Sequence, residues 1–167
     1  MLFDLHHDIE LTVSDMRESI LVNLKKRFAK AGLRNYQSFV LDLTRVDSKS
    51  QISRAAFSRT GFDVIICDAP CTGSGTWSRT PEQLYFFDGK TEEYSVLQKE
   101  IVSNIIPRLK TGGSLLYITC SVFKTENEEV IEFVKSNFEL ELIEMQLLKG
   151  YDNKADTMFA ALLKKNS

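Results

Sequence analysis

Two cysteines of this sequence stand just beyond short apolar runs, where loops of an α/β protein carry reactive side chains. Cys71 lies three residues after Asp68, which follows the apolar residues 64–67, and Cys120 follows the apolar residues 115–118. A thiolate is the side chain suited to adding reversibly to an electron-poor carbon. Each position therefore combines sulfur with the end of a predicted strand, and Cys71 also has a carboxylate close by. This pattern predicts nucleophilic, covalent chemistry.

Burial as a small hydrophobic residue is the alternative role for a cysteine. That role suits Cys67, which lies inside an apolar run. Cys71 lies between Pro70 and Thr72 in an irregular segment, and Cys120 stands at the tip of a predicted strand. A functional role is therefore favoured for these two thiols.

Two aspartates follow the earlier predicted strands. Asp15 comes after the alternating residues 9–13, and Asp42 comes after the β-rich residues 36–41. One such carboxylate can accept both hydroxyls of a ribose, and the next can accept an amino proton of adenine. Each aspartate taken alone is more often a helix cap or a turn residue. Together they indicate a cofactor that carries adenosine.

The elements that must position these residues alternate along the chain, as in an α/β sheet protein. Apolar positions at helical spacing predict helices over residues 16–28, closed by Gly32, and 94–109, ended by residues 111–113. A third helix is expected to open with the capping box Thr125-x-x-Glu128 and to turn residues 130, 131 and 134 inward. The polar residues 48–58 are expected to be partly helical. The continuously apolar residues 63–67 predict a strand covered by helices on both faces.

The end of the chain departs from this alternation. Residues 139–147 and 157–163 read as strands separated only by the turn-like residues 150–156, so they are expected to pair antiparallel. The sequence therefore predicts a mostly parallel sheet with an antiparallel hairpin at its C-terminal end. No domain boundary is visible, which predicts one domain over residues 1–167.

Composition narrows the class of protein. The 167 residues are 43% hydrophobic and 26% charged, as in one compact globular domain. No apolar run reaches the ~18 residues that a membrane helix requires, and the acidic start does not resemble an export signal. Three cysteines without a Cys-x-x-Cys pair predict neither a disulfide framework nor a metal site. We expect a cytoplasmic protein without membrane partners.

The charges are unevenly distributed although the formal net charge is only -2. Nine basic residues and two acidic residues lie between positions 25 and 59, whereas seven glutamates and two lysines lie between positions 124 and 144. Ordinary solvated faces are the simpler interpretation. The more specific interpretation is a basic flank that contacts a phosphate backbone.

Two segments closely resemble the paired Pro-Cys and Thr-Cys motifs of the Fmu/Sun (RsmB-type) RNA cytosine-C5 methyltransferases. They are Asp68-Ala-Pro-Cys-Thr-Gly-Ser-Gly-Thr76 and Tyr117-Ile-Thr-Cys-Ser-Val-Phe-Lys-Thr-Glu-Asn127. The terminal residues 156–163 are similar to the closing hairpin strand of that family. The resemblance implies a Rossmann-like methyltransferase fold that uses S-adenosylmethionine.

The resemblance also implies roles for the thiols. Cys120 matches the cysteine that adds to carbon 6 of a cytosine, so that carbon 5 takes a methyl group. Cys71 matches the cysteine that assists loss of the carbon 5 proton and release of the enzyme. The RNA cytosine, in transfer or ribosomal RNA, would be unpaired or flipped out of its stack. Trp77 is a candidate for stacking on RNA, with loop packing as the commoner role.

Further positions follow from the same motifs. Asp68 is implied to hydrogen-bond the polar edge of the base and to join Asp15 and Asp42 in the cofactor site. Pro70 and Thr119, which precede the two cysteines, are implied to contact the substrate.

One part of the family pattern is missing from this sequence. A first strand running into a glycine-rich loop with a lysine should precede Asp15, yet the first glycine is Gly32. We therefore expect a C-terminal portion of a methyltransferase catalytic domain, weak or inactive alone. Its sheet edge beside residues 9–13 would be open to self-association.

Two other functions fit some of the residues. A non-catalytic module that binds RNA or protein would use the basic flank and would bind RNA with a steep salt dependence. Methylation of an exocyclic amine ranks lower, because Cys71 stands where such enzymes place an aromatic residue and Cys120 would have no role.

Overall fold

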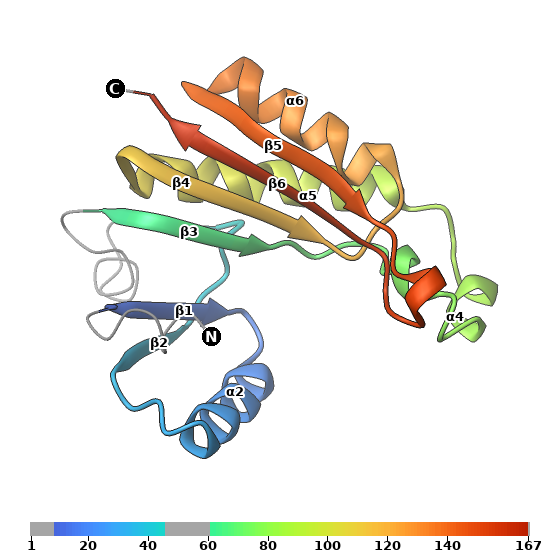
Figure 1. Cartoon of the computed structure of the whole chain (residues 1–167), viewed down its shortest axis with the longest axis horizontal. Helices are drawn as coiled ribbons and strands as arrows, with labels where there is room; N and C mark the ends of the chain where they lie inside the picture. The colour runs from blue at the N-terminus through green and yellow to red at the C-terminus, as the bar shows by residue number, and fades with distance from the viewer. Residues whose placement is uncertain (1–8, 46–60, 167) are drawn as a thin grey trace. The chain divides into compact units, whose positions relative to one another are not determined.

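The computed structural model describes residues 9–45 and 61–166, which fall into two compact units (Figure 1). The first unit is Met1–Arg59 and the second is Thr60–Ser167. No change of composition marks this boundary in the sequence, and the single domain over residues 1–167 stays a prediction. The expected helical character of residues 48–58, and part of the basic flank, lie outside the described residues.

The first unit is a strand, a helix and a strand, as predicted. Its elements are β1 (Leu11–Asp15), α2 (Glu18–Lys30) and β2 (Tyr36–Val40). The strands pair in parallel, with Asp15 opposite Val40, so their carboxyl ends share one edge. Gly32 ends the helix with a φ of 75°, and the next N–H, of Leu33, donates to the carbonyl of Phe28 at 2.9 Å.

The second unit contains a mixed sheet of four strands in the order β3-β4-β6-β5. The strands are β3 (Phe62–Asp68), β4 (Leu109–Thr119), β5 (Leu140–Leu148) and β6 (Met158–Lys165). β3 is parallel to β4, whereas β6 is antiparallel to both β4 and β5. The predicted C-terminal hairpin is confirmed.

The larger helices of this unit, α5 (Thr91–Ile105) and α6 (Glu128–Asn137), lie on the same side of the sheet (Figure 1). Short helical turns link the remaining elements. They are η1 (Ser74–Thr76), α4 (Glu82–Tyr85), η2 (Ile106–Arg108), η3 (Lys124–Glu126) and η4 (Tyr151–Asn153).

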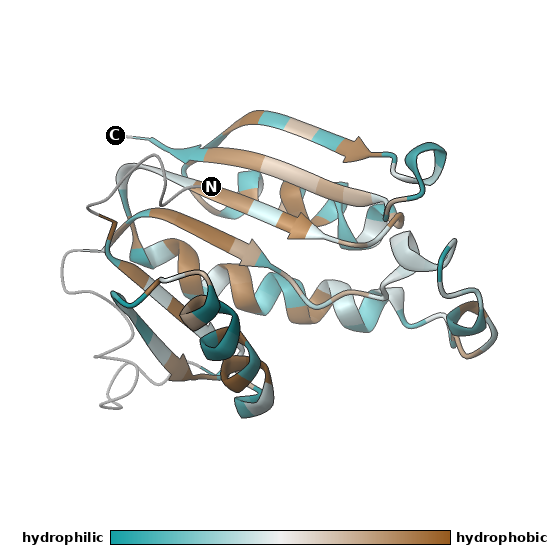
Figure 2. Ribbon diagram, turned by 60° about the horizontal axis from the view of Figure 1, so that its bottom comes forward, coloured by the Kyte–Doolittle hydropathy of each residue, from teal (hydrophilic) through white to brown (hydrophobic). Residues whose placement is uncertain are grey.

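The core of the second unit lies between these helices and the sheet. Val130, Ile131 and Val134 of α6 are fully buried, as their spacing predicts, and face a strand whose Leu115 and Tyr117 are also fully buried. Burial of each such side chain contributes about 1.5–3 kcal/mol. Figure 2 shows hydrophobic colour along the central strands of this sheet. This core fixes the register of β4 and with it the position of Cys120.

Burial along β3 alternates, which corrects the prediction of a strand covered on both faces. Cys67 is buried, whereas Val64 and Ile66 are each 59% exposed. Successive side chains of a strand point to opposite faces, and α5 and α6 lie on only one of them. The apolar run therefore reflects one buried face and one apolar face left accessible.

Two helix boundaries also differ from prediction. The helix expected to reach residue 109 ends at Ile105, because Pro107 has no N–H to donate and the chain passes through η2 into β4. The predicted capping box is wrong, since Thr125 lies in η3 and Asn127 is the residue that precedes α6. That turn already has its own backbone hydrogen bonds, from Glu126 and Asn127.

Candidate active site

The site begins where β3 and β4 end side by side. Asp68 is opposite Ile118 in the parallel ladder, and the N–H of Ala69 donates to the carbonyl of Ile118 at 2.9 Å. The next residues of both strands consequently enter the same edge of the sheet. This register brings Cys71 and Cys120 together, with their Sγ atoms 3.2 Å apart.

Both thiols are free and partly exposed. Their separation is well beyond the ~2.05 Å of a disulfide and is that of a sulfur–sulfur hydrogen bond. The thiol of Cys67, by contrast, is buried, and burial raises its pKa to about 12. Cys67 is therefore a packing residue, as its place in the strand predicts, and the pair Cys71 and Cys120 is the reactive feature.

The two thiols are not equivalent. The hydrogen bond from Cys71 lowers the pKa of Cys120 to about 7, against the opposing effects of partial burial and of the carboxylates of Asp68 and Asp156. The same hydrogen bond, together with burial, raises the pKa of Cys71. The directions of these pKa shifts favour Cys120 as the thiolate and Cys71 as the donor, although the geometry lets either thiol donate.

Gly75 joins the two cysteine loops to the turn between β5 and β6. Its N–H donates to the carbonyl of Cys120 at 2.8 Å, and its carbonyl accepts the N–H of Thr157 at 2.9 Å. A Cβ at this position would lie 2.0 Å from the carbonyl oxygen of Thr157. Only glycine permits this approach of three backbone segments.

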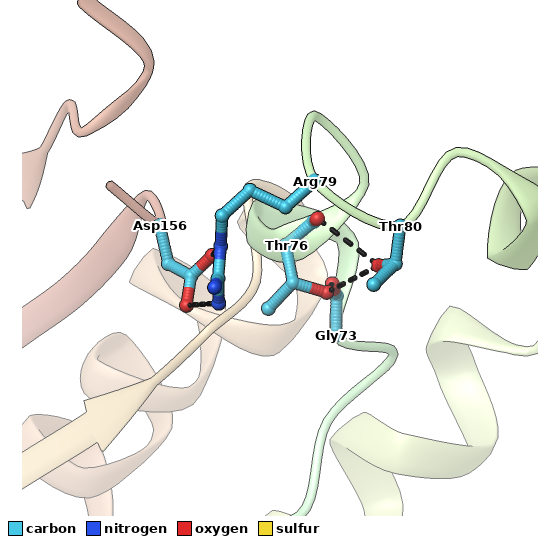
Figure 3. A network of polar contacts seen from close by, with 5 residues as sticks. All are labelled: Gly73, Thr76, Arg79, Thr80 and Asp156. Atoms are coloured by element: carbon cyan, nitrogen blue, oxygen red, sulfur yellow. Dashed lines mark hydrogen bonds and ion pairs between the residues drawn. The ribbon is translucent and has the colours of Figure 1, made fainter. Parts of the chain in front are cut away.

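The segment after Cys71 is held by the network in Figure 3. Gly73 has a φ of 72°, and its carbonyl accepts the hydroxyl of Thr76 at 2.8 Å. Thr80 in turn donates to the carbonyl of Thr76 at 3.1 Å. Arg79 forms an ion pair with Asp156, with Nε 2.6 Å from Oδ1. The loop is therefore anchored to the β5–β6 turn by side chains as well as by backbone.

The other predicted residues of this edge differ in accessibility. Asp68 and Pro70 are exposed, and the carbonyl of Pro70 accepts a hydrogen bond from Gln98 at 2.8 Å. Thr119 is fully buried and its hydroxyl donates to Oδ1 of Asn127. This hydrogen bond connects the start of the Cys120 loop to Asn127, and the substrate contact of Thr119 stays a prediction.

The predicted cofactor aspartates meet at the carboxyl edge of the first unit. Asp15 accepts the N–H of Arg17 at 2.7 Å, and its Oδ1 is 3.2 Å from the guanidinium Nε of the same residue. Oδ1 of Asp42 accepts the hydroxyl and the N–H of Thr44, at 2.6 and 2.9 Å, and these bonds lower the pKa of Asp42. Both carboxylates are fixed by turns and lie at one end of neighbouring strands.

Trp77 has a packing role. Its ring centroid lies 5.0 Å from that of Phe87 and 5.9 Å from that of Phe123, and the ring is partly buried. The expected stacking on RNA would compete with these contacts.

Sequence reasoning missed Glu126 and Asn127 as parts of the site. Both are buried, and both hydrogen-bond the residues that flank the cysteines. A signal was present: Glu126 stands four residues before Val130, on the inward face of the coming helix. The inward position of Glu126 was not recognised, because the neighbouring Thr125 and Glu128 were interpreted as a capping box.

Within residues 9–45 and 61–166, no cluster of three His, Cys, Asp or Glu side chains is arranged to hold a metal ion. None of the helices in this part of the chain is both long and apolar enough to cross a membrane.

A family model for the 16S rRNA methyltransferases RsmB/F matches residues 2–164. The chain belongs to this family. The match confirms the resemblance carried by the Pro-Cys and Thr-Cys motifs.

Individual relatives agree with the family match. The probable ribosomal RNA small subunit methyltransferase B of Coxiella burnetii is 33% identical over 93% of this chain. The ribosomal RNA small subunit methyltransferase F of Shewanella sediminis is 40% identical over 57% of it. The chain spans only 38% and 20% of the lengths of these two proteins.

A solved structure shows the same fold. The crystal structure of NSun6 from Pyrococcus horikoshii with SFG superposes with a TM-score of 0.78 at 21% identity, over 95% of this chain and 42% of that one. The Rossmann-like methyltransferase fold expected from the sequence is confirmed.

Proposed function

We propose that this chain carries the catalytic thiols of an RNA cytosine-C5 methyltransferase that acts on small-subunit ribosomal RNA with S-adenosylmethionine. One observation supports the chemistry above all: the Sγ atoms of Cys71 and Cys120 lie 3.2 Å apart, at the sheet edge where β3 and β4 end. Membership of the RsmB/F family supports the RNA substrate. The proposed location is the cytoplasm, where thiols stay reduced.

The first step uses the Cys120 thiolate. Its electron pair forms a bond to carbon 6 of the cytosine, and the π pair between carbons 5 and 6 becomes a nucleophilic pair at carbon 5. Asp68 stands exposed at the same sheet edge, where it would hydrogen-bond the polar edge of the base. Pro70, also exposed beside Cys71, would contact the base as well. The target cytosine must be unpaired or flipped out to reach this edge.

The second step uses Cys71. Once Cys120 is bound to carbon, it is no longer a thiolate, so the hydrogen bond and charge that raise the pKa of Cys71 are lost. Cys71 then releases its proton to water and takes the proton from carbon 5. The electrons of that C–H bond restore the double bond between carbons 5 and 6, and Cys120 leaves as a thiolate. Cys71, Cys120 and water therefore account for every proton and electron pair that moves in this step.

Asp15 and Asp42 fit an adenosine-bearing cofactor. Both carboxylates lie at the carboxyl ends of adjacent parallel strands, the usual position of ligands in such sheets. Asp15 would accept the ribose hydroxyls, and Asp42 the adenine amino group. When bound, S-adenosylmethionine supplies the methyl group that carbon 5 accepts. Asp68 is proposed to contact the cofactor as well as the base.

The experiment is a covalent trap. RNA that carries 5-fluorocytosine cannot lose a proton from carbon 5, so the enzyme should remain attached. In the presence of S-adenosylmethionine, the chain and its Cys71→Ala variant should form an adduct that survives denaturing electrophoresis. Cys120→Ala should form none, and Cys67→Ala, which alters the buried third thiol, should behave as the unaltered chain. An adduct that persists in Cys120→Ala would overturn the proposal.

The same samples separate a non-catalytic module from an enzyme. A binding module would retain RNA with a steep salt dependence and would form no adduct with any variant.

Self-association through the first unit is a separate proposal. Among the described residues β1 pairs only with β2, so its other edge presents free backbone donors and acceptors. Light scattering should show a mass that rises with protein concentration. A constant monomer mass over the accessible range would contradict this proposal.

A further inference from the structure

The side chain of Glu126 is completely buried beneath the two cysteine loops. Its Oε1 accepts the hydroxyl of Thr72 at 2.8 Å and that of Ser121 at 2.9 Å. Its Oε2 accepts the backbone N–H of Thr72 at 2.8 Å, and Nε2 of Gln98 lies 3.5 Å from the same oxygen. All four groups are donors, which is the environment of an acceptor-only, ionised carboxylate.

Burial of the Glu126 carboxylate is unfavourable in free energy, so its presence calls for a specific role. Removing a carboxylate from water costs several kcal/mol, and the four hydrogen-bond partners of Glu126 are uncharged groups. An apolar side chain of similar volume would fill the space without that cost. The carboxylate instead satisfies donors that come from two different loops.

Three of the four donors belong to the residues that follow Cys71 and Cys120. Thr72 comes directly after Cys71, and Ser121 comes directly after Cys120. One carboxylate therefore binds both loops one residue beyond each sulfur atom. Additional contacts between Ser74 and Ser121, with their hydroxyls 3.2 Å apart, close the same junction.

Glu126 is itself held rigidly. The hydroxyl of Tyr117 donates to its backbone carbonyl at 2.7 Å, and the adjacent Asn127 donates to the carbonyl of Ser121 at 2.8 Å. Gln98 connects α5 to the carbonyl of Pro70 as well as to Glu126. The carboxylate is thus fixed to the strand, the helix and both loops.

We infer that Glu126 is a positioning residue that sets the distance between the sulfur atoms of Cys71 and Cys120. The inference rests on the proposed function, because the separation matters to catalysis only if both thiols act on one base. Thiol measurements test the geometry without any methylation, so the inference about Glu126 and the proposed function can fail separately.

The test compares Glu126→Gln with Glu129→Gln, which alters an exposed glutamate in the first turn of α6, three residues further along the chain. Glutamine retains the volume of Glu126 but places an NH2 against a donor, so one loop loses its partner. In a glutathione redox buffer, the two thiols give two electrons and two protons to glutathione disulfide and close a disulfide. The equilibrium constant for closure reports how well the sulfurs are held together. We expect it to fall about tenfold or more in Glu126→Gln and to be unchanged in Glu129→Gln.

A second readout is the pH dependence of Cys120 alkylation by iodoacetamide, followed by peptide mass spectrometry. A longer sulfur–sulfur distance weakens the hydrogen bond from Cys71, so the midpoint should move from about 7 toward the ordinary 9.0. In a methylation assay, kcat should fall while KM for RNA changes little.

The outcomes are distinguishable. If Glu126→Gln melts at a lower temperature but keeps both thiol readouts, Glu126 is merely structural and the inference is overturned. If the readouts move while the adduct with 5-fluorocytosine RNA persists in Cys120→Ala, the positioning role stands and the proposed function fails. Should Glu126→Gln not fold, Ser121→Ala removes one donor and decides the question. It must shift both readouts in the same direction, by a smaller factor, or the inference is overturned.

Discussion

The two sheet edges that carry candidate chemistry are built in different ways. At the carboxyl edge of β1 and β2, Asp15 and Asp42 are held by Arg17 and Thr44, each only two residues further along the chain. At the carboxyl edge of β3 and β4, Cys71 and Cys120 come from positions 49 residues apart. The first edge is a pair of local turns, whereas the second depends on the whole second unit.

This difference determines what each edge can tolerate. A turn re-forms after a neighbour changes, because its partners are adjacent in sequence. The thiol pair exists only while the register of β3 and β4, the Gly75 contacts and the Glu126 network are all intact. Substitutions at these contacts of the second unit should therefore alter thiol chemistry, and substitutions in the first unit should not.

The largest effect is expected from Gly75→Ala. The added methyl would lie 2.0 Å from the Thr157 carbonyl and 2.9 Å from that of Cys120, so backbone must move. We expect a loss of about 3 kcal/mol in the free energy of unfolding, measured by urea denaturation, together with loss of disulfide closure between the thiols. Gly89→Ala is the control: nothing lies within 4 Å of its Cβ, and only its positive φ of 79° is strained, at about 1 kcal/mol. Equal losses in both variants would contradict the role of Gly75.

Asp42→Asn tests whether the first edge acts separately. A hydrogen bond to a charged acceptor is worth about 1.5–3 kcal/mol, so S-adenosylmethionine should bind about tenfold more weakly by calorimetry. The alkylation profile of Cys120 should not change. Asp88→Asn, at an exposed aspartate of the other unit, should alter neither quantity. A shift in thiol reactivity with Asp42→Asn would break the separation of the two edges.

Cys71→Ala tests the asymmetry of the thiol pair. Without the hydrogen bond, the alkylation midpoint of Cys120 should rise from about 7 toward 9.0, since only the thiolate reacts. At pH 7 the thiolate fraction falls about fiftyfold, but a more basic thiolate is about eightfold more nucleophilic, so the rate should fall about sixfold. Alkylation reactions that are quenched at timed intervals, from pH 6 to 10, measure both the midpoint and the rate at pH 7. An unchanged midpoint would show that the hydrogen bond does not set the pKa.

The smallest effect is expected from Arg79→Gln. Its ion pair with Asp156 is mostly exposed, and such pairs add little and are screened by salt. Thermal melting should show a slight decrease at low salt that vanishes at high salt. A large, salt-independent decrease would show that the network of Figure 3 supports the fold rather than only the loop.

Periodic patterns predicted much of this molecule. The inward face of α6 and the antiparallel pairing of β5 with β6 follow from spacing alone, because burial on one side imposes that spacing. The motifs around Cys71 and Cys120 predicted two thiols at one site, and the structure brings their Sγ atoms within 3.2 Å. These features depend on neighbouring residues or on short motifs that a sequence displays directly.

Features that depend on tertiary contacts were not predicted. The role of Glu126 arises from donors 5, 28 and 54 residues away, which no local pattern reveals. The motif did not predict that the hydroxyl of Thr119 is buried and donates to Asn127. The end of α5 was placed too late, because its apolar spacing runs through Pro107 into β4.

The position of β6 inside the sheet has a consequence for how the protein is made. Among the described strands this one comes last in the chain, yet it lies between β4 and β5 and pairs with both. While a ribosome is still synthesising residues 158–165, β4 lacks one of its two neighbours, and Thr157 is not yet in place against Gly75. The contact between Cys71 and Cys120 is therefore completed only after translation has passed this strand, so the thiol pair is not held in place in the shorter nascent chain.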